Sequence, residues 1–276
     1  AGKLPILALR GLAVFPDQTV HFDVGRAKSV LALEAAMKED QTLFLVPQKD
    51  LLVDDPKLKD LYAVGTVAKV KQVLRPQGEN LRILVTGLCR GRITEVAQSE
   101  PYLAGTVEAV PEPEEGNSMR AQALRREANN LYGLYLQMSE HPAQAVYLHM
   151  MASNSCGYIA DSIAQNSGIE FPDKGKLLCQ LNPVRRLEMA LRLLHREVEM
   201  LNLESEIQEK TKEVMDKNQR DYYLREQIKV IQDELGEGED ENECESYAAE
   251  IQGLKLDKDV EKKLLKDVER LKKQPF

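Results

Sequence analysis

Two short segments contain the glycine and lysine residues that phosphate-binding loops use: residues 25–29 (GRAKS) and residues 173–176 (DKGK). A loop that cradles nucleotide phosphates follows the pattern G-x-x-x-x-G-K-[ST], because its backbone amides must converge on the phosphate oxygens. In both segments another residue type stands five positions before the glycine. The sequence therefore gives no basis for nucleotide hydrolysis, and we expect no cofactor-binding residue.

Catalytic and metal-binding patterns are also absent from the sequence. It contains no G-x-S-x-G nucleophile elbow and no H-E-x-x-H zinc signature. The four histidines show no ligand spacing to one another or to a cysteine, and His195, among leucines and arginines, is better explained by a structural role. A serine–lysine or serine–histidine pair assembled in space stays open, because its members need not be neighbours in sequence. We expect no catalytic and no metal-binding residue here.

Tyr222 and Tyr223 are the remaining candidates, within the charged residues 218–241 (NQRDYYLREQIKVIQDELGEGEDE). Successive residues of a helix point about 100° apart, so the two rings must face different directions. Tyr222 lies on a mainly charged side, beside an apolar stripe made by Leu224, Ile228, Ile231 and Leu235. We expect one ring to seat the end of the helix and the other to be available to another chain. The equally weighted alternative is that both rings cover the apolar stripe.

These tyrosines lie on one very long predicted helix, which begins at Asn182-Pro183 and continues to Gly236. Asparagine caps helices well and proline fits the first helical position. At about 1.5 Å per residue this helix would be about 80 Å long. Its first third carries a leucine stripe that fits packing on a bundle, whereas between residues 208 and 221 only Val214 and Met215 are apolar. We expect that middle part to be solvated or paired with another chain.

The first 110 residues are predicted to form a β-rich domain. Six short runs are rich in β-branched and aliphatic residues and end at turn residues, as strands do. They cover residues 4–9, 19–24, 42–46, 64–74, 81–86 and 92–96, and one amphipathic helix is predicted at residues 29–37. Proline and glycine within residues 75–80 indicate a hairpin loop. These elements indicate a small, curled α+β barrel or sandwich.

Residues 111–117 (PEPEEGN) have the composition of a linker, and the pattern after them is helical. Apolar residues recur at steps of three and four from Leu124 to Met138, which predicts an amphipathic helix that ends at His141-Pro142. A further helical segment, residues 158–164, is predicted to end before Gly168. We therefore expect a helical bundle with its long arm over residues 118–236. Residues 237–276 are expected to form an acidic loop, at 237–241, and a helical connector.

Composition limits the classes of function. The net charge of −8 and the pI near 5.3 do not favour a protein that grips nucleic acid. The basic residues of the long helix leave DNA binding open, but acidic residues interleave with them at ion-pair spacing. The four cysteines form no CxxC pair, which is typical of free thiols in a reducing cytoplasm. No run of about 18 apolar residues exists, so we expect no membrane span.

Three longer stretches resemble the N-terminal region of the Lon family of ATP-dependent proteases. They are LPILALRGLAVFPDQTVHFDVGRAKSVLALEAAM, GTVAKVKQVLRPQGENLRILVTGLCRGRI and MDKNQRDYYLREQIKVIQDELGEGEDE, in the family's order and over essentially the whole chain. The resemblance implies that the β-rich part is the PUA-like Lon N-terminal domain. In the family this region recognises misfolded or tagged proteins and supports a homo-hexamer. The family's ATPase and its proteolytic domain with a serine–lysine dyad would follow Phe276, so ATP and magnesium are implied only for the full-length protein.

The resemblance turns exposed apolar residues into candidates for substrate binding, because unfolded chains offer apolar segments. Leu12, Val14 and Phe15, between Gly11 and Pro16, are the candidates of the β-rich domain, although burial in a core strand is the stronger alternative for each. Tyr222 and Tyr223 are the candidates of the long helix. A stand-alone Lon N-terminal-domain protein that binds polypeptides is the competing hypothesis. The length of the native reading frame separates the two, and the chain alone is expected to associate weakly.

Overall fold

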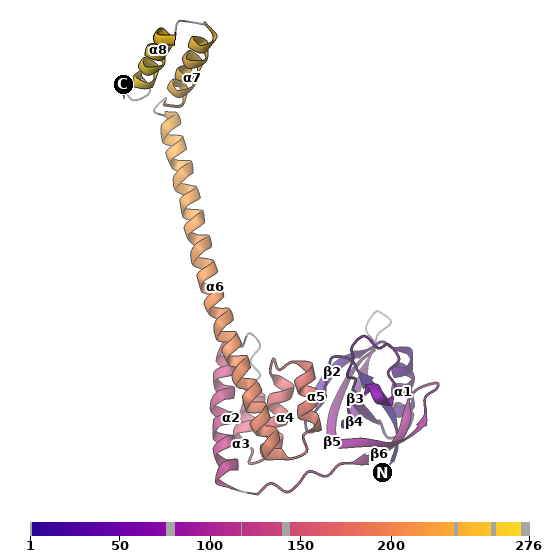
Figure 1. Ribbon diagram of the computed structural model, residues 1–276. Coiled ribbons are helices and arrows are strands. Elements are labelled where there is room, and N and C mark those ends of the chain that lie inside the picture. Colours follow the sequence, from indigo (N-terminus) through magenta and orange to yellow (C-terminus); the bar gives the residue numbers. More distant parts are fainter. Residues whose placement is uncertain are drawn as a thin grey trace. The chain divides into compact units, whose positions relative to one another are not determined.

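The computed structural model describes residues 2–75, 81–116, 118–139, 144–234, 237–254 and 258–271. The chain divides into two compact units, Ala1–Leu203 and Glu204–Phe276. Figure 1 shows the first unit as a curled sheet beside a group of helices, and the second as the remainder of a long helix followed by a helix pair. The helix α6, Pro183–Glu234, contributes residues to both units.

The sheet of the first unit has six strands in the order β2-β5-β4-β3-β1-β6. The strands are β1 (Gly2–Leu9), β2 (Thr19–Val24), β3 (Thr42–Pro47), β4 (Gly65–Leu74), β5 (Leu81–Gln98) and β6 (Ala104–Ala109). β5 is long enough to pair with β4 along its first half and with β6 along its second half. This second pairing closes β5, β4, β3, β1 and β6 into a ring, with β2 attached to β5. Among the strands of the described residues, only β1 and β3 pair in parallel.

Alternating apolar residues give the β-domain two cores. One lies between the sheet and the helix α1 (Ala27–Lys38), and it includes Leu7, Leu9, Leu33 and Ile83. The other gathers Ile6, Phe44, Val46, Leu61 and Val107. The short 3-10 helix η1 (Leu58–Asp60) lies in the connection from β3 to β4. The predicted curled α+β barrel is therefore confirmed.

The helical part of the first unit comprises α2 (Met119–Met138), α3 (Gln144–Ala152), α4 (Cys156–Asn166), α5 (Phe171–Cys179) and the beginning of α6. Side-chain oxygens cap three of these helices: Ser118 accepts from Ala121 N, Ser155 from Tyr158 N, and Asn182 from Arg185 N. Such caps satisfy amides that the first turn leaves without a partner. α4 is the central helix, because Ile159, Ala160, Ile163 and Ala164 are all fully buried.

The segment before β2 connects the β-domain to the helices. Ala13 and Phe15 belong to the apolar core of the helical part, and Phe15 N donates to Gln165 Oε1 at 3.1 Å. Gly87 of β5 passes directly beneath this segment, where a Cβ atom would collide with the carbonyl group of Phe15. The β-domain and the first helices therefore share one core and form a single packed unit.

The second unit contains the rest of α6, α7 (Glu237–Gly253) and α8 (Lys258–Leu271). α7 and α8 pack on each other. Many large apolar side chains of this unit are exposed, including Val214, Met215, Tyr222, Tyr223, Ile228, Ile231, Tyr247 and Leu254. No helix of the described residues is long and apolar enough to cross a membrane.

Several predicted boundaries differ from the structure. The runs predicted at residues 81–86 and 92–96 form one strand, β5, because bulges let it change partners without a break. β6 and α5 were missed, and the acidic residues 237–241 begin α7 where a loop was expected. The predicted hairpin residues 76–80, the end of the linker at Asn117, the helix end at His141-Pro142, Leu235 and the end of α6 at Gly236 lie outside the described residues.

Candidate functional site

A cleft of about 600 Å³ lies where the β-domain meets the helices. β5 contributes Leu88, Cys89 and Arg90, and α4 with its cap contributes Ser155, Gly157, Tyr158 and Asp161. Pro16 and Asp17 from the segment before β2, and residues 109–112 from the end of β6 and the linker, complete the lining. A cleft at such a junction, of this size, is where proteins commonly bind ligands.

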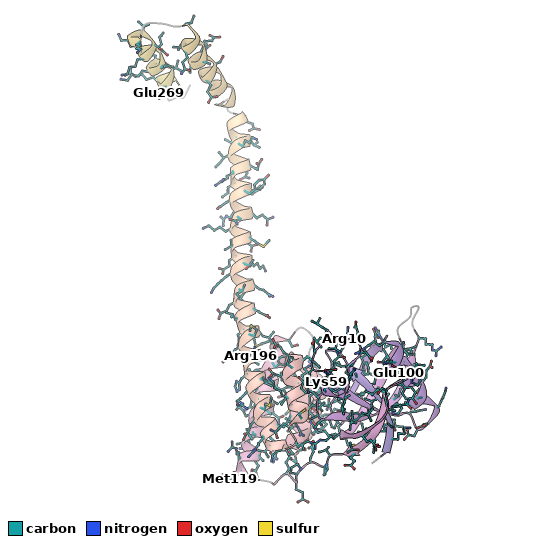
Figure 2. The ribbon with its side chains drawn as sticks, turned by 45° about the vertical axis from the view of Figure 1, so that its right-hand side comes forward. Arg10, Lys59, Glu100, Met119, Arg196 and Glu269 are labelled. Atoms are coloured by element: carbon teal, nitrogen blue, oxygen red, sulfur yellow. The ribbon has the colours of Figure 1, made fainter. Side chains whose placement is uncertain are left out.

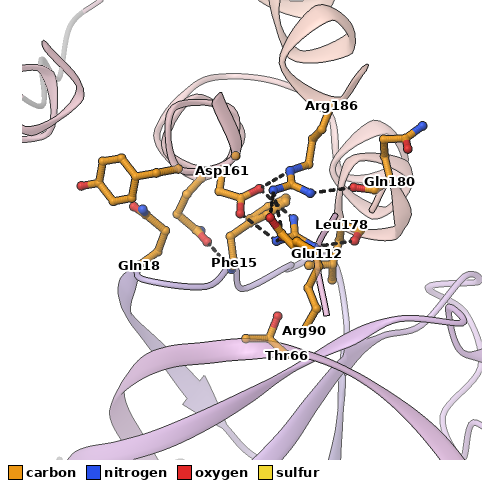
Figure 3. Close-up of polar contacts among 12 residues, drawn as sticks. Phe15, Gln18, Thr66, Arg90, Glu112, Asp161, Leu178, Gln180 and Arg186 are labelled. Carbon is orange, nitrogen blue, oxygen red and sulfur yellow. Dashed lines mark hydrogen bonds and ion pairs between the residues drawn. The ribbon is translucent and has the colours of Figure 1, made fainter. Parts of the chain in front are cut away.

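Two buried charged groups form the base of the cleft. Arg90 projects from β5 with only 1% of its side chain exposed, and Asp161 projects from α4 with 5% exposed. Arg90 Nη1 and Nη2 donate to Asp161 Oδ2 and Oδ1 at 2.8 and 2.7 Å, a bidentate pair that is visible in Figure 3. Arg90 Nε also donates to the carbonyl oxygen of Leu178 at 3.0 Å. Arg90 thus connects the sheet to both α4 and α5.

Arg186 and Glu112 extend this pair into a cluster of four charges. Arg186, in the first turn of α6, has 0% of its side chain exposed and donates Nη2 to both oxygens of Glu112 at 2.9 Å. Its Nε lies 3.0 Å from Asp161 Oδ1, and its Nη1 donates to Gln180 O at 2.7 Å. Glu112 also accepts from Arg90 Nη1 at 2.6 Å. The cluster therefore joins the sheet, the linker, α4 and α6 (Figure 3).

The charges of this cluster sum to zero, because two guanidinium groups face two carboxylates. Burial lowers the pKa of Arg90, but the hydrogen bonds and charges of Asp161 and Glu112 outweigh burial, so the pKa lies above its ordinary value. Gly157 provides room for the cluster: a Cβ atom there would lie 2.8 Å from Arg186 Nη2 and 3.1 Å from Glu112 Oε2. Unpaired ions cannot remain buried at this depth, so the four groups need one another.

The charged groups at the cleft are paired with one another. The guanidinium groups and Asp161 are occupied by one another, and burial raises the pKa of the half-buried Cys89 thiol, which disfavours a reactive thiolate. Among the described residues no group of three histidine, cysteine, aspartate or glutamate side chains could hold a metal ion. The accessible wall is mostly apolar, with Leu88 49% exposed and the Asp17 carboxylate at the rim.

The residues that line this cleft lie within a range that matches the model of a known family. Residues 3–196 match the model of the family described as "ATP-dependent protease La (LON) substrate-binding domain". The chain belongs to the Lon family. The resemblance predicted from the sequence is therefore confirmed.

Lon relatives are similar along almost the whole chain. The Lon protease of Heliobacterium modesticaldum is 40% identical over 274 residues, which cover 99% of this chain and 34% of the relative. Lon protease 1 of Thermus thermophilus is 38% identical over 278 residues, which cover 98% of this chain and 34% of the relative. The chain thus spans about a third of the length of these relatives.

Solved Lon structures share the fold. The N-terminal domain of a Mycobacterium avium complex Lon protease has a TM-score of 0.59 and 24% identity, and the match covers 70% of this chain and 98% of that one. A Lon N-terminal domain protein from Xanthomonas campestris has a TM-score of 0.50 and 15% identity, with the same coverage. At these identities the likeness concerns the fold alone. It confirms the predicted β-rich domain followed by helices.

The structure does not place the first group of predicted Lon substrate-binding residues on an open surface. Phe15 is 0% exposed and Val14 is 1% exposed, and Leu12 is half-buried against the core of the β-domain. The expectation that Val14 and Phe15 offer accessible apolar surface is therefore wrong. The reason is the position of the segment between Gly87 and the helical core, where an apolar side chain is buried from both sides.

The two tyrosines are exposed, as a binding role requires. Tyr222 is 67% exposed and Tyr223 is 61% exposed, both in the second unit. Gln227 Nε2 donates to the Tyr223 hydroxyl at 3.0 Å, which fixes that ring along the helix. Leu224 and Ile228 are themselves 44% and 55% exposed, so the rings leave much of the apolar stripe open. These tyrosines belong to the second unit, whereas Leu12, Val14 and Phe15 belong to the first.

Sequence reasoning missed the charged cluster. Arg90 occurs within an apolar strand and Asp161 within the apolar run YIADSIA, and a charge amid buried residues is a signal of pairing. That signal identifies each residue alone but not its partner, which lies 71 residues away. Glu112 was assigned to a linker because of the composition of residues 111–117, which also does not reveal its partners.

Proposed function

We propose that this chain is the polypeptide-recognition region of an ATP-dependent Lon protease. The single observation that carries the proposal is the match of residues 3–196 to the Lon substrate-binding family. Because the chain spans about a third of its relatives, the activities of a whole Lon protease belong to this proposal as well. In it, a longer parent protein uses ATP, magnesium and a serine–lysine dyad to degrade misfolded, abnormal and selected regulatory proteins. None of those groups is assigned to a residue of this chain.

The exposed apolar side chains support a polypeptide as the ligand. Tyr222 and Tyr223 retain most of their surface in contact with solvent, and the wall of the cleft adds Leu88. Unfolded and misfolded proteins expose apolar segments that folded proteins bury, so accessible apolar surface distinguishes the two by the hydrophobic effect. We propose Tyr222 and Tyr223 as contacts for such segments. Leu12 is a weaker candidate, because most of its surface is already covered.

The direct test compares one protein in its unfolded and folded forms. The probe is fluorescently labelled α-lactalbumin, either reduced and carboxymethylated so that it stays unfolded, or native. Fluorescence anisotropy of each form is measured during titration with the 276-residue chain. We expect saturable binding of the unfolded form and at least about tenfold weaker binding of the native form, as a difference of about 1.4 kcal/mol would give. Equal affinities for the two forms would refute the proposal.

The proposal extends to assembly and location. A hexamer is proposed for the parent protein, and weak association for this chain alone, because the exposed part of α6 is mainly polar and offers little apolar contact area. Free thiols at Cys89, Cys156 and Cys179 fit a cytoplasmic location. The net charge of −8 favours protein substrates over DNA.

One solved structure is compatible with the competing hypothesis of a stand-alone Lon N-terminal-domain protein. A Lon N-terminal domain protein from Xanthomonas campestris has 98% of its chain covered by this fold. A stand-alone polypeptide-binding module would therefore have the same first unit. The native reading frame decides between them: a frame about three times as long as this chain, in line with the 34% coverage of the relatives, supports the protease.

A further inference from the structure

The connection from β3 to β4 presents leucine side chains to solvent on the first unit. Leu52 is 88% exposed, Leu51 is 44% exposed and Leu58 is 49% exposed. We call these three residues the leucine tip. Single exposed leucines are ordinary on protein surfaces. Here three exposed leucines lie within eight residues of one connection, inside the range that matches the Lon substrate-binding family.

A buried glutamine holds the loop from inside. Gln48, at the end of β3, is 0% exposed, and its Nε2 donates to the carbonyl oxygens of Asp50 and Val53 at 2.6 and 3.0 Å. Its Oε1 accepts from Arg26 Nη2 at 2.9 Å. Arg26 in turn donates Nη1 to the carbonyl oxygen of Asp54 at 3.1 Å. Two side chains therefore fix three carbonyl groups of the loop.

Further bonds fix the outer part of the loop. Arg10, labelled in Figure 2, donates Nη2 to Val53 O at 3.2 Å and to the Asp54 carboxylate at 2.6 Å. Lys28 Nζ binds both oxygens of Asp55 at 3.0 and 2.9 Å. Leu52 N donates to the carboxylate of Asp50 at 2.9 Å, directly at the tip.

Hydrogen bonds also join the two ends of the loop. Lys49 N donates to Asp60 O at 2.7 Å, and Lys49 Nζ donates to the carbonyl oxygen of Lys59 at 3.0 Å; Lys59 is labelled in Figure 2. Both ends and the middle of the loop thus have a set conformation. A preorganised apolar contact loses little conformational entropy on binding, which is the condition for a useful binding surface.

We propose that the leucine tip is a docking surface for apolar segments of unfolded polypeptides. The inference rests on the proposed function and names one surface that performs it on the first unit. The three side chains and the fixed backbone between them would hold one or two apolar side chains of an extended chain against the loop. The affinity of one such contact is modest, which suits a region that must release its substrate.

The size and charge of the leucine tip favour an unfolded polypeptide as its ligand. Three leucines of one loop cannot supply the ~800 Å² per partner that a stable dimer buries, so a second copy of this chain is a poor fit. The β3–β4 connection carries three lysines and four aspartates, a net charge of −1: Lys49, Lys57, Lys59, Asp50, Asp54, Asp55 and Asp60. A connection without net positive charge offers little attraction for nucleic acid, so its exposed leucines favour an apolar ligand instead.

Substitution of the tip tests the proposal with a closely matched control. Leu51→Ser with Leu52→Ser removes most of the apolar tip without touching a buried side chain. Met119→Ser removes an apolar side chain that is also 88% exposed, at the start of α2. With reduced, carboxymethylated α-lactalbumin as the probe, the tip variant should bind about tenfold more weakly than wild type. The control should stay within about twofold.

A second pair of variants tests whether the fixed conformation matters. Arg10→Gln removes the ion pair with Asp54 and weakens the hold on Val53 while it leaves every leucine in place. Arg82→Gln removes a similar exposed pair with Asp23, away from the loop. We expect Arg10→Gln to weaken binding by about threefold, as a loss of preorganisation predicts. Arg82→Gln should have no effect.

The outcomes separate this inference from the proposed function. If wild type binds the unfolded probe and the tip variant binds it equally well, the leucine tip is refuted while polypeptide recognition stands. If the Met119 variant loses as much affinity as the tip variant, the tip is also refuted, since any exposed apolar residue would then serve. If wild type does not bind the probe, both proposals fail. A change in sedimentation of the tip variant alone would assign the surface to self-association and overturn the inference.

Discussion

Replacing Asp161 by alanine tests whether the buried charges hold the first unit together. The substitution leaves two guanidinium groups, 1% and 0% exposed, with Glu112 as their only carboxylate in the cluster. The net charge of the cluster changes from zero to +1. Removing one partner of a buried ion pair typically costs about 3–5 kcal/mol, because the remaining charge stays desolvated. For a unit of this size, about 2–4 °C per kcal/mol corresponds to a fall of roughly 6–20 °C in the melting temperature.

The measurement is chemical and thermal denaturation of the 276-residue chain, followed by far-UV circular dichroism. Asp23→Ala is the control, because Asp23 also makes a bidentate pair with an arginine, Arg82, but at 47% and 52% exposure. Water and salt screen an exposed pair, so this variant should lose far less stability. A loss for Asp161→Ala that is no larger than the loss for Asp23→Ala would refute the reasoning.

A double variant identifies the source of the loss. Arg90→Met with Asp161→Leu removes one positive and one negative charge, and it leaves Arg186 paired with Glu112. Replacing both members of a buried pair by apolar residues is often neutral or stabilising. We therefore expect the double variant to be more stable than Asp161→Ala alone. If it is less stable, the loss comes from packing and the charge argument is wrong.

Three further predictions follow from single residues. Phe15→Ser should cost about 3–5 kcal/mol in the free energy of unfolding, as loss of a buried aromatic ring does, which thermal denaturation measures. Burial lowers the pKa of Lys174, so the folded chain binds that proton less tightly than the unfolded chain does. The stability of wild type relative to Lys174→Met should therefore rise from pH 7 towards pH ~10.4. Urea titrations at each pH measure this difference. Lys176→Met is the control, because a hydrogen bond with Asp173 raises the pKa of Lys176 and the stability it adds persists over the same range. In the proposed parent protease, Tyr222→Ala should reduce degradation of folded or bulky substrates more than it reduces ATP hydrolysis. Equal loss of both activities, or no loss of either, would mean that the tyrosine only contributes packing.

Local patterns were sufficient to predict most of the secondary structure. Runs rich in β-branched and aliphatic residues, bounded by turn residues, predicted β1 to β4, and the asparagine–proline pair predicted the start of α6 at Pro183. They failed where long-range contacts decide the structure. β6, with the sequence AGTVEA, has too weak a pattern of its own and is stabilised by pairing with the second half of β5. The break predicted between the runs 81–86 and 92–96 is likewise absent, because β5 continues from one partner strand to the next. Local patterns also cannot show that acidic residues such as Glu237 continue as a helix.

The candidate site was harder to predict than the fold, because exposure depends on three-dimensional neighbours. Phe15 and Leu52 are both large apolar residues beside turn-forming residues in the sequence. Phe15 is buried because Gly87 and the helical core close over it, whereas Leu52 is exposed because polar bonds to the backbone hold its loop away from the core. No periodicity in the sequence distinguishes these two cases. For Tyr222 and Tyr223 the sequence predicted one seated ring and one available ring, with both rings on the apolar stripe as the alternative. Both rings are exposed in the structure, on a mostly polar helix.

The linker shows most clearly how composition and function diverge. Its prolines and glutamates predict a solvated connection, yet Glu112 binds two buried arginines and Glu115 accepts a hydrogen bond from Gly157 N at 2.7 Å. The carboxylates are therefore structural partners of α4 and α6, and the linker fixes the helices to the β-domain. The β-domain and the helices up to Leu203 are therefore parts of one compact unit. The proposed docking of a polypeptide on the leucine tip would use a loop on this unit whose conformation is set by Gln48, Arg26 and Arg10.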